Sequence, residues 1–419
     1  MVILISASRL SGTIVEYKSD FNDDIHGIIL MPMLLFMPWC ILDRAYDVGE
    51  IEILPFERDA AFAECDEAVL RDLNTLLAAY KTIQGESVRK LAIVRYKGRS
   101  PIDDLSDDQI GTAYDLVTLA TFAGLSAREF FNAIGSYCNS DCFTMYVQTF
   151  EDTTHTALTT RRREGSQVSV WPIDGVAMVV PPHCHTVRTV NLDEELLGAL
   201  VKKRSGANTN EWSRWLSSIS CFNQANTDSE GVRPQSEWVL LCGALQHLLN
   251  AGSKDKAVAT ELHDALVPIR EILIGAAKRR LPNWTDETKS VRYAWMKEFY
   301  GIRGDFAHGR LNTQRPAAWT LHEHLVLGSI AFPLVAKTLL RQSGEYEFTH
   351  DDEVQQNSFE SLADTANFLR PPDEQQGGLD SHWARVRQQA QHDIRVAEAM
   401  RAFEAIRVAQ EEERSVESE

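Results

Sequence analysis

The 419-residue sequence lacks the motifs of several common enzyme classes. It has no glycine-rich phosphate-binding loop, no Gly-x-Ser-x-Gly nucleophile turn and no His-Glu-x-x-His pair. The sequence therefore gives no motif evidence for an NTP-driven enzyme or for a hydrolase of the best-known classes. A long uninterrupted apolar run is also missing. The strongest run, residues 27–42, is shorter than a membrane span and is broken by Pro32 and Pro38, so we expect it to form buried strands.

Cysteine is sparse, and positive charge is not in excess. The seven cysteines show no regular framework, and the chain opens without a basic stretch leading into an apolar core, so we expect a reduced, cytoplasmic protein with no membrane partner. The formal charge of −18 argues at first against a nucleic-acid partner, because phosphate binding needs clustered Lys and Arg. Half of this excess lies in residues 351–419, which carry 16 acidic and 7 basic side chains. The remainder is only mildly acidic, with basic clusters at 161–163, 202–204 and 278–280.

Strand and helix signals alternate over residues 1–190 and predict an α+β N-terminal domain of unknown role. Short apolar or β-branched runs lie at 1–5, 12–17, 28–42, 51–54 and 92–96, and again at 142–150, 157–160, 167–171 and 176–180. A helix is expected at 59–81. Ser106 with Gln109, and Ser126 with Glu129, fit capping boxes that begin two more helices.

Helical periodicity replaces these signals from residue 191 and predicts an all-α helical domain over 191–342. The expected helices span 192–203, 210–224, 235–250, 255–277, 285–308 and 316–341. The helix at 285–308 is the best specified, with Thr285 as its N-cap and Gly309 as its left-handed C-terminal residue. Its buried stripe would consist of Val291, Trp295, Phe299, Ile302 and Phe306.

Residues 343–419 are predicted to form an acidic linker and a polar helix. The linker composition is Gln-rich, with Pro371-Pro372 and Gly377-Gly378. The helix, at 382–414, carries an apolar seam suited to a partner helix: Trp383, Val386, Ala390, Ile394, Ala397, Met400 and Phe403. A partly folded tail is the alternative. We also hypothesise that the acidic tail regulates the protein by occupying a basic cleft as a mimic of RNA.

The segment from Tyr300 to Arg310 (YGIRGDFAHGR) contains Arg303 and, after four residues, His308. This spacing alone is weak, because it recurs by chance. Other Arg–His matches are Arg315 with His322, and Arg385 or Arg387 with His392. The Arg303 match differs from them because it ends a well-specified helix and has aromatic and glycine neighbours.

Arg303 and His308 suit RNA cleavage without a metal. The reaction must deprotonate the 2′-hydroxyl, stabilise charge on the pentacoordinate phosphate and protonate the leaving 5′-oxygen. An imidazole titrates near neutral pH, so His308 fits proton transfer. Arg303 stays charged and can hold a phosphate through two parallel hydrogen bonds. Supporting candidates are Asp305, Tyr300, Arg310 and His322.

Residues 205–342 resemble the HEPN superfamily and, within it, the ApeA-like branch. The signature of that branch has Tyr, then Arg, a small residue and His-Gly, which match Tyr300, Arg303, Gly304 and His308-Gly309. Segments 215–226 and 237–249 resemble the preceding helices of the branch. The chain departs from the branch at Gln246, where Glu is usual, and at Gly304, where Ser is usual.

This resemblance implies a metal-independent endoribonuclease, acting on RNA as a toxin or antiviral defence effector, without a cofactor. It also implies a homodimer whose motif-bearing helices face each other. Residues five apart lie about 140° apart around a helix, so one chain would aim Arg303 and His308 in different directions. The alternative is a non-catalytic HEPN dimerisation or RNA-binding module, with residues 1–190 as sensor. In that module Arg303 would pair with an acid such as Asp305 or Glu298.

A zinc site is a secondary possibility and would suit an enzyme of another class centred on residues 1–190. Its candidate ligands are Cys138, Cys142, His183 and His185. No second close pair fixes the geometry, and buried cysteine is common, so the main expectation is that no metal binds. His322 and His324 flank Glu323 and are expected either to face the motif cleft or to lie on ordinary helix surface.

Overall fold

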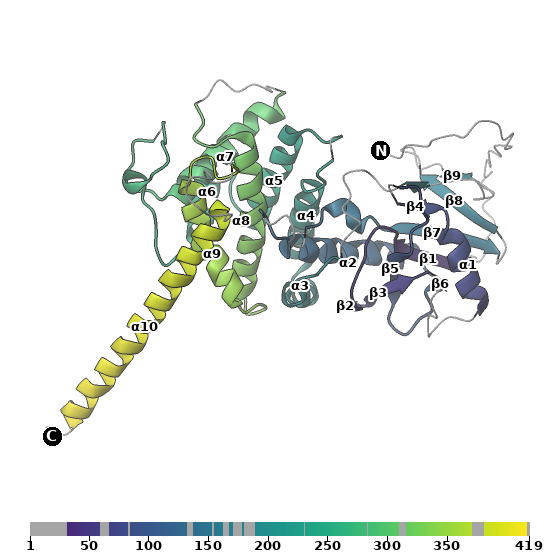
Figure 1. Ribbon diagram of the computed structural model, residues 1–419, viewed down its shortest axis with the longest axis horizontal. Helices are drawn as coiled ribbons and strands as arrows, with labels where there is room; N and C mark the ends of the chain where they lie inside the picture. Colours follow the sequence, from purple (N-terminus) through teal and green to yellow (C-terminus); the bar gives the residue numbers. More distant parts are fainter. Residues whose placement is uncertain are drawn as a thin grey trace. The chain divides into compact units, whose positions relative to one another are not determined.

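The computed structural model describes residues 32–58, 67–82, 84–131, 137–152, 155–161, 167–170, 178–179, 189–229, 231–282, 284–309, 316–370 and 381–416. These fall into two compact units, one within residues 1–201 and 226–232, the other within 202–225 and 233–419. An α+β region with an antiparallel sheet is followed by a mostly helical region (Figure 1), which confirms the coarse fold prediction. The strands expected at 1–5 and 12–17 lie outside the described residues.

The N-terminal unit is built on one sheet of antiparallel strand pairs in the order β2-β3-β5-β1-β7-β8-β9, with β6 also paired to β1. The strands are β1 (Pro32–Met37), β2 (Tyr46–Val48), β3 (Ile51–Glu57), β5 (Lys90–Tyr96), β6 (Ile102–Asp104), β7 (Tyr146–Asp152), β8 (His155–Arg161) and β9 (Gln167–Val170). Strands β1 and β5 are buried over most of their length, as expected from their continuous apolar sequence. The short strands β4 (Tyr80–Lys81) and β10 (Met178–Val179) form a separate parallel pair.

Helices α1 (Glu67–Leu77) and α2 (Asp107–Ser126), the single turn η1 (Ser140–Phe143) and residues 194–201 of α3 (Glu194–Gly206) complete this unit among the described residues. The first capping box is confirmed: the Ser106 hydroxyl accepts from the Gln109 backbone N–H at 3.3 Å, and the Gln109 side chain accepts from the Ser106 N–H at 2.9 Å. The second is wrong, because Ser126 ends α2 and no helix begins there. The apolar second half of α2 lets that helix run on through Ser126.

Gly124 lies where α2 packs against η1. A Cβ at Gly124 would come within 2.3 Å of the Phe143 ring, which is buried. We therefore expect Gly124→Ala to lower the free energy of unfolding by about 1–3 kcal/mol through overpacking. Gly111→Ala on the same helix, where a Cβ meets nothing within 4 Å, is the matched control and should be neutral or stabilising. Urea unfolding measures both, and equal effects would contradict this packing.

The C-terminal unit is mostly helical. Its helices are α4 (Thr209–Gln224), α5 (Pro234–Leu248), α6 (Asp255–Ala265), α7 (Val291–Ala307), α8 (Leu321–Gln342), α9 (His350–Asp364) and α10 (His382–Val416), with a single turn η2 (Ile274–Ala276); α3 (Glu194–Gly206) precedes them. Aromatic side chains form the core. Phe222 stacks on Phe332 with ring centres 4.4 Å apart, and Trp238 lies 5.1 Å from Phe299. These contacts join α4 to α8 and α5 to α7.

Several expected helices are shorter than predicted; the one expected at 316–341, for example, begins only at Leu321. The helix expected at 255–277 ends at Ala265, because Pro268 disfavours helix at the residue before it. Helix α7 begins after Ser290 rather than Thr285, and the Ser290 hydroxyl accepts from the Tyr293 N–H at 3.2 Å. The predicted C-terminal glycine is confirmed, since Gly309 has φ +76°. Four members of the predicted stripe are buried and the fifth, Phe306, is half-buried.

Helix α9 stands where a linker was expected, so the linker prediction is wrong over residues 350–364. Its apolar side chains Val354, Phe359 and Leu362 are buried. Three of its acidic side chains are buried and paired: Asp352 with Lys337 and Tyr346 (both 2.6 Å), Glu360 with Arg292 (2.7 Å), and Asp364 with the backbone N–H groups of Lys278 and Arg279 (2.8 and 2.9 Å). These carboxylates are therefore not available to mimic RNA.

Within the described part of the chain, α8 is the one helix long and apolar enough to cross a membrane. Of its most apolar window, 78% is buried inside the fold. This burial is typical of a core helix. It agrees with the aromatic contact between Phe332 of α8 and Phe222 of α4.

Candidate functional site

Two neutral side chains hold the guanidinium of Arg303 on α7. Its Nη1 donates to the Tyr300 hydroxyl at 2.6 Å and to Gln246 Oε1 at 3.3 Å. The Tyr300 hydroxyl in turn donates to the same Gln246 oxygen at 2.7 Å. The guanidinium carbon lies 5.0 Å from the centre of the Tyr300 ring, a cation–π distance. Gln246 is therefore a direct hydrogen-bond partner of both Arg303 and Tyr300. It is one of the two positions at which the sequence departs from the ApeA-like branch that it resembles.

No acid in the described part of the chain pairs with the charge of Arg303. Among residues 284–309, 316–370 and the other described ranges, Arg303 makes no ion pair, and its side chain is half-buried. Glu298 is used elsewhere, since it accepts hydrogen bonds from the backbone N–H groups of Ala318 and Trp319. Burial raises the pKa of Tyr300, although the charge of Arg303 partly opposes this, so the hydroxyl stays protonated and donates. An oriented, uncompensated guanidinium is suited to binding an anion.

His308 caps the C-terminus of α7. Its backbone N–H donates to the Gly304 carbonyl at 3.1 Å, and its side chain is exposed. Gly309 then turns the chain away. Because Arg303 and His308 are five residues apart, they point to different sides of α7, about 140° apart. This geometry predicts that one chain does not bring the two side chains into a common cleft.

The supporting candidates differ in their positions. Tyr300 contacts Arg303 directly. Asp305 is buried, and His322 is exposed in the first turn of α8. Arg310 lies outside the described residues.

Cys138 and Cys142 are buried thiols. The Cys138 thiol donates to the Gly124 carbonyl at 3.5 Å, and the Cys142 thiol donates to Asn139 Oδ1 at 3.4 Å. Burial raises the pKa of Cys138 to about 12, so without a metal the thiol is protonated. His183 and His185 lie outside the described residues, within which no group of three or more potential ligands could hold a metal ion. Two of the four candidate ligands are thus buried thiols, and the zinc site stays a prediction.

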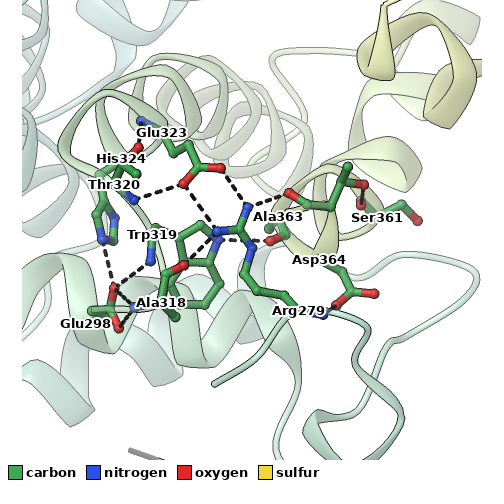
Figure 2. Close-up of polar contacts among 11 residues, drawn as sticks. Arg279, Glu298, Ala318, Trp319, Thr320, Glu323, His324, Ser361, Ala363 and Asp364 are labelled. Atoms are coloured by element: carbon green, nitrogen blue, oxygen red, sulfur yellow. Dashed lines mark hydrogen bonds and ion pairs between the residues drawn. The ribbon is translucent and has the colours of Figure 1, made fainter. Parts of the chain in front are cut away.

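A second polar constellation lies at the start of α8 (Figure 2). Arg279 and Glu323 form a two-fold hydrogen-bonded ion pair, with Nη2–Oε1 at 2.8 Å and Nη1–Oε2 at 3.2 Å. The two side chains are only 4% and 3% exposed. Arg279 also donates to the carbonyls of Ala318 and Thr365. The basic cluster noted at 278–280 is therefore not a free surface patch, because its central Arg is buried and paired.

His324 is fully buried, so the expectation that it lies on helix surface is wrong. Its Nε2 lies 3.1 Å from Glu298 Oε1 and donates to it, because a carboxylate only accepts. The ring packs against Trp238 and Phe299, with centres 4.4 and 5.4 Å away. The sequence does contain a sign of this burial. His324 precedes the buried Leu327 by three residues and therefore lies on the same face of the helix.

Burial of His324 makes stability dependent on pH. Burial lowers the pKa of His324, and the nearby Glu298 only partly opposes this. The unfolded chain then binds the proton more readily than the folded chain. Stability is therefore full above pH 6.5 and falls, by up to about 1.4 kcal/mol per pH unit, as the pH drops toward the lowered folded pKa.

We expect His324→Gln to reduce the slope of unfolding free energy against pH between pH 7.5 and 5.5, measured by urea unfolding. His392→Gln, an exposed position on α10, is the matched control and should keep the wild-type slope. A wild-type slope in His324→Gln would show that His324 does not control this dependence.

Comparison of the chain with protein-family models, with curated proteins and with solved structures finds no match. The candidate site is therefore argued from its own contacts. In this site the charged Arg303 donates hydrogen bonds to two neutral side chains, and the exposed His308 lies at the end of the same helix.

Proposed function

We propose that the protein is a metal-independent endoribonuclease of the HEPN type, with Arg303 and His308 as its catalytic residues. The state of Arg303 is the main support. An Arg with a purely structural role at a helix end would be expected to pair with an acid such as Glu298. Arg303 instead lies on Tyr300 and Gln246, which orient the guanidinium and leave its charge free for a phosphate.

The proposed reaction is an internal transesterification of RNA. A base takes the proton of a 2′-hydroxyl, and the oxygen attacks the adjacent phosphorus. The bond to the 5′-oxygen breaks, and that oxygen gains a proton. The products are a 2′,3′-cyclic phosphate and a 5′-hydroxyl. His308 transfers protons, and Arg303 stabilises the charge that develops on the non-bridging oxygens.

The proposed site is shared between two chains. Arg303 and His308 point to different sides of α7, so a second copy must supply the missing partner. A two-fold axis beside α7 would gather two Arg and two His side chains, and the two imidazoles could then act as base and acid. The resemblance to HEPN proteins adds the proposed role, that of a cytoplasmic toxin or antiviral defence effector.

Cleavage of total cellular RNA tests the proposal. Purified wild type should degrade the RNA, and His308→Ala should not. His392→Ala, which removes an exposed His from α10, is the matched control and should cleave like wild type. Thermal unfolding of each variant checks that it is folded. Equal cleavage by wild type and His308→Ala would contradict the proposal.

A non-catalytic dimerisation or RNA-binding module is the second candidate. The separation of Arg303 and His308 around α7 favours it, because one chain presents only one of them on each side. Under this candidate RNA binds, Arg303→Ala weakens the binding, and neither wild type nor His308→Ala cleaves. Fluorescence anisotropy with labelled RNA, measured beside the cleavage assay, separates the two functions.

A further inference from the structure

A small hollow lies beside α7 in the C-terminal unit. It encloses about 180 Å³, between the start of α6, one side of α7 and the segments before and after α7. The residues that line it include Asp255, Trp284, Lys297, Glu298, Gly301 and Pro316. Pockets for drug-sized ligands measure about 300–1,000 Å³, so this hollow has room for one ring system and not for a whole nucleotide.

Existing contacts hold the walls of the hollow in place. Glu298 accepts hydrogen bonds from the backbone N–H groups of Ala318 and Trp319, which ties the segment before α8 to α7. The ring of Trp284 meets the ring of Tyr293 edge-on, with centres 6.1 Å apart. The hollow is thus formed before a ligand binds, which reduces the entropy lost on binding.

The hollow lies on the same side of α7 as His308. At about 100° per residue, Lys297 and Gly301 lie within about 20° of His308 around the helix axis. The four lining positions of α7 (297, 298, 301 and 302) are centred about 50° from His308 and about 170° from Arg303. Along the axis, Gly301 lies about 10 Å from His308. RNA that reaches His308 can therefore place a neighbouring base in this hollow.

Trp284 offers a stacking surface on which a flexible cation lies. Lys297 Nζ is 4.6 Å from the centre of the Trp284 ring, and Lys297 makes no ion pair in the described part of the chain. An exposed cation–π contact is worth about 2- to 5-fold in an equilibrium constant, whereas a base stacked on an aromatic ring is worth about 5- to 150-fold. A base can therefore displace the ammonium, whose flexible stem then lets it reach a phosphate.

Asp255 gives the hollow a hydrogen-bond acceptor. Its Oδ1 accepts from the Lys256 backbone N–H at 2.8 Å, and no contact of its Oδ2 is present within the described ranges. A carboxylate only accepts, so it bonds the amino group at position 4 of cytosine and repels the carbonyl oxygen at position 4 of uracil. The hollow therefore favours a base that carries an amino group.

We propose that this hollow is a base-binding subsite for single-stranded RNA, in which a base with an amino group stacks on Trp284 and donates to Asp255. Lys297 then contacts a phosphate of the same strand. The assignment rests on the proposed function, since that function brings RNA to His308. Single-stranded RNA is recognised in this general way, because its unstacked bases lie against aromatic side chains and hydrogen-bond through their edges. The subsite selects which phosphate reaches His308.

Binding of a labelled 2′-O-methyl C oligonucleotide, followed by fluorescence anisotropy, tests the subsite. RNA without a free 2′-hydroxyl can bind but cannot be cleaved. Trp284→Ala should raise the dissociation constant by about 5- to 150-fold. Trp212→Ala, which removes another half-buried Trp from α4, is the matched control and should bind like wild type. Equal binding by the two variants would overturn the proposal.

Filling the hollow is a second test that removes no existing side-chain contact. A Cβ at Gly301 meets nothing within 4 Å, so Gly301→Leu has room in the fold and should occupy the space of the base. Leu favours helix over Gly, so the unfolding temperature should hold or rise while binding weakens by at least about 5-fold. Gly198→Leu, at an exposed and equally open position of α3, is the matched control and should bind like wild type. Wild-type affinity in Gly301→Leu would overturn the subsite.

Base preference tests the role of Asp255. Wild type should bind the C oligonucleotide at least about 5-fold more tightly than a 2′-O-methyl U oligonucleotide. Asp255→Ala should lose this preference and keep its affinity for the U oligonucleotide. A wild type that binds the two equally, or binds neither, would overturn the subsite.

Cleavage of RNA measured in parallel separates this proposal from the proposed function. Cleavage by wild type and by Trp284→Ala with the same kcat/KM and no base preference would overturn the subsite and leave the ribonuclease proposal intact. The expected binding pattern without any cleavage would support the subsite and contradict the ribonuclease activity.

Discussion

Arg279→Ala is expected to lower the free energy of unfolding by about 3–5 kcal/mol, because it leaves the Glu323 carboxylate buried without its counter-ion. Arg279 also donates to the carbonyls of Ala318 and Thr365 and lies over the Trp319 ring. One side chain thus joins the segment before α7, the start of α8 and the end of α9 (Figure 2). Urea unfolding followed by tryptophan fluorescence measures the loss.

Two control variants show whether the cost of Arg279→Ala comes from leaving a charge buried or from losing an ion pair. Arg407→Ala removes an exposed partner of Glu404 on α10 and should cost less than about 1 kcal/mol. Replacing both Arg279 and Glu323 by Leu should recover much of the loss, since no unpaired charge then stays buried. A cost for Arg279→Ala as small as that for Arg407→Ala would contradict the arrangement at the start of α8.

Arg303→Ala and His308→Ala are each expected to slow RNA cleavage by at least about 1,000-fold, because each removes a group required in the transition state. Mixing the two inactive variants should restore part of the activity, since a mixed dimer contains one intact Arg and one intact His. Recovery is measured as the initial rate of cleavage of labelled RNA. The control is each variant alone at twice the concentration.

The outcome of the mixing experiment is informative only if subunits exchange. Fluorescence energy transfer between differently labelled subunits, measured after the two variants are mixed, checks exchange. If the variants exchange and their mixture stays inactive, the site is not shared between two chains in the way proposed.

The sequence predicts most elements correctly where one local signal is present. Ser106 with Gln109 begins α2, and Gly309 ends α7. The prediction is wrong where two signals compete. Thr285 and Ser290 can both cap a helix, and the structure uses Ser290. Long-range backbone hydrogen bonds decide between them, since the Val291 N–H donates to the Ile272 carbonyl at 2.9 Å and keeps the chain before α7 extended.

Charge composition misleads where acids are buried. Asp352, Glu360 and Asp364 make residues 350–364 look like a linker, yet each has a buried partner far from it in the sequence. Local pattern cannot identify these partners, because chain folding brings them together. The composition rule holds only for acids that stay in water.

The candidate site also combines one feature that the sequence reveals with contacts that only the structure reveals. The spacing of Arg303 and His308 is local, so the sequence alone identifies the pair. The contact of Arg303 with Gln246 joins residues 57 apart and is visible only in the structure. The ion pair of Arg279 with Glu323, 44 residues apart, is likewise not evident from either residue's neighbours.

Analysis of the RNA product ends in the presence of EDTA tests the central claim most directly. We expect wild-type protein to cleave RNA with all divalent metal chelated and to leave 2′,3′-cyclic phosphate and 5′-hydroxyl ends, with no cleavage by His308→Ala. Cleavage that stops in EDTA, or products with 5′-phosphate ends, would contradict a metal-independent site at Arg303 and His308.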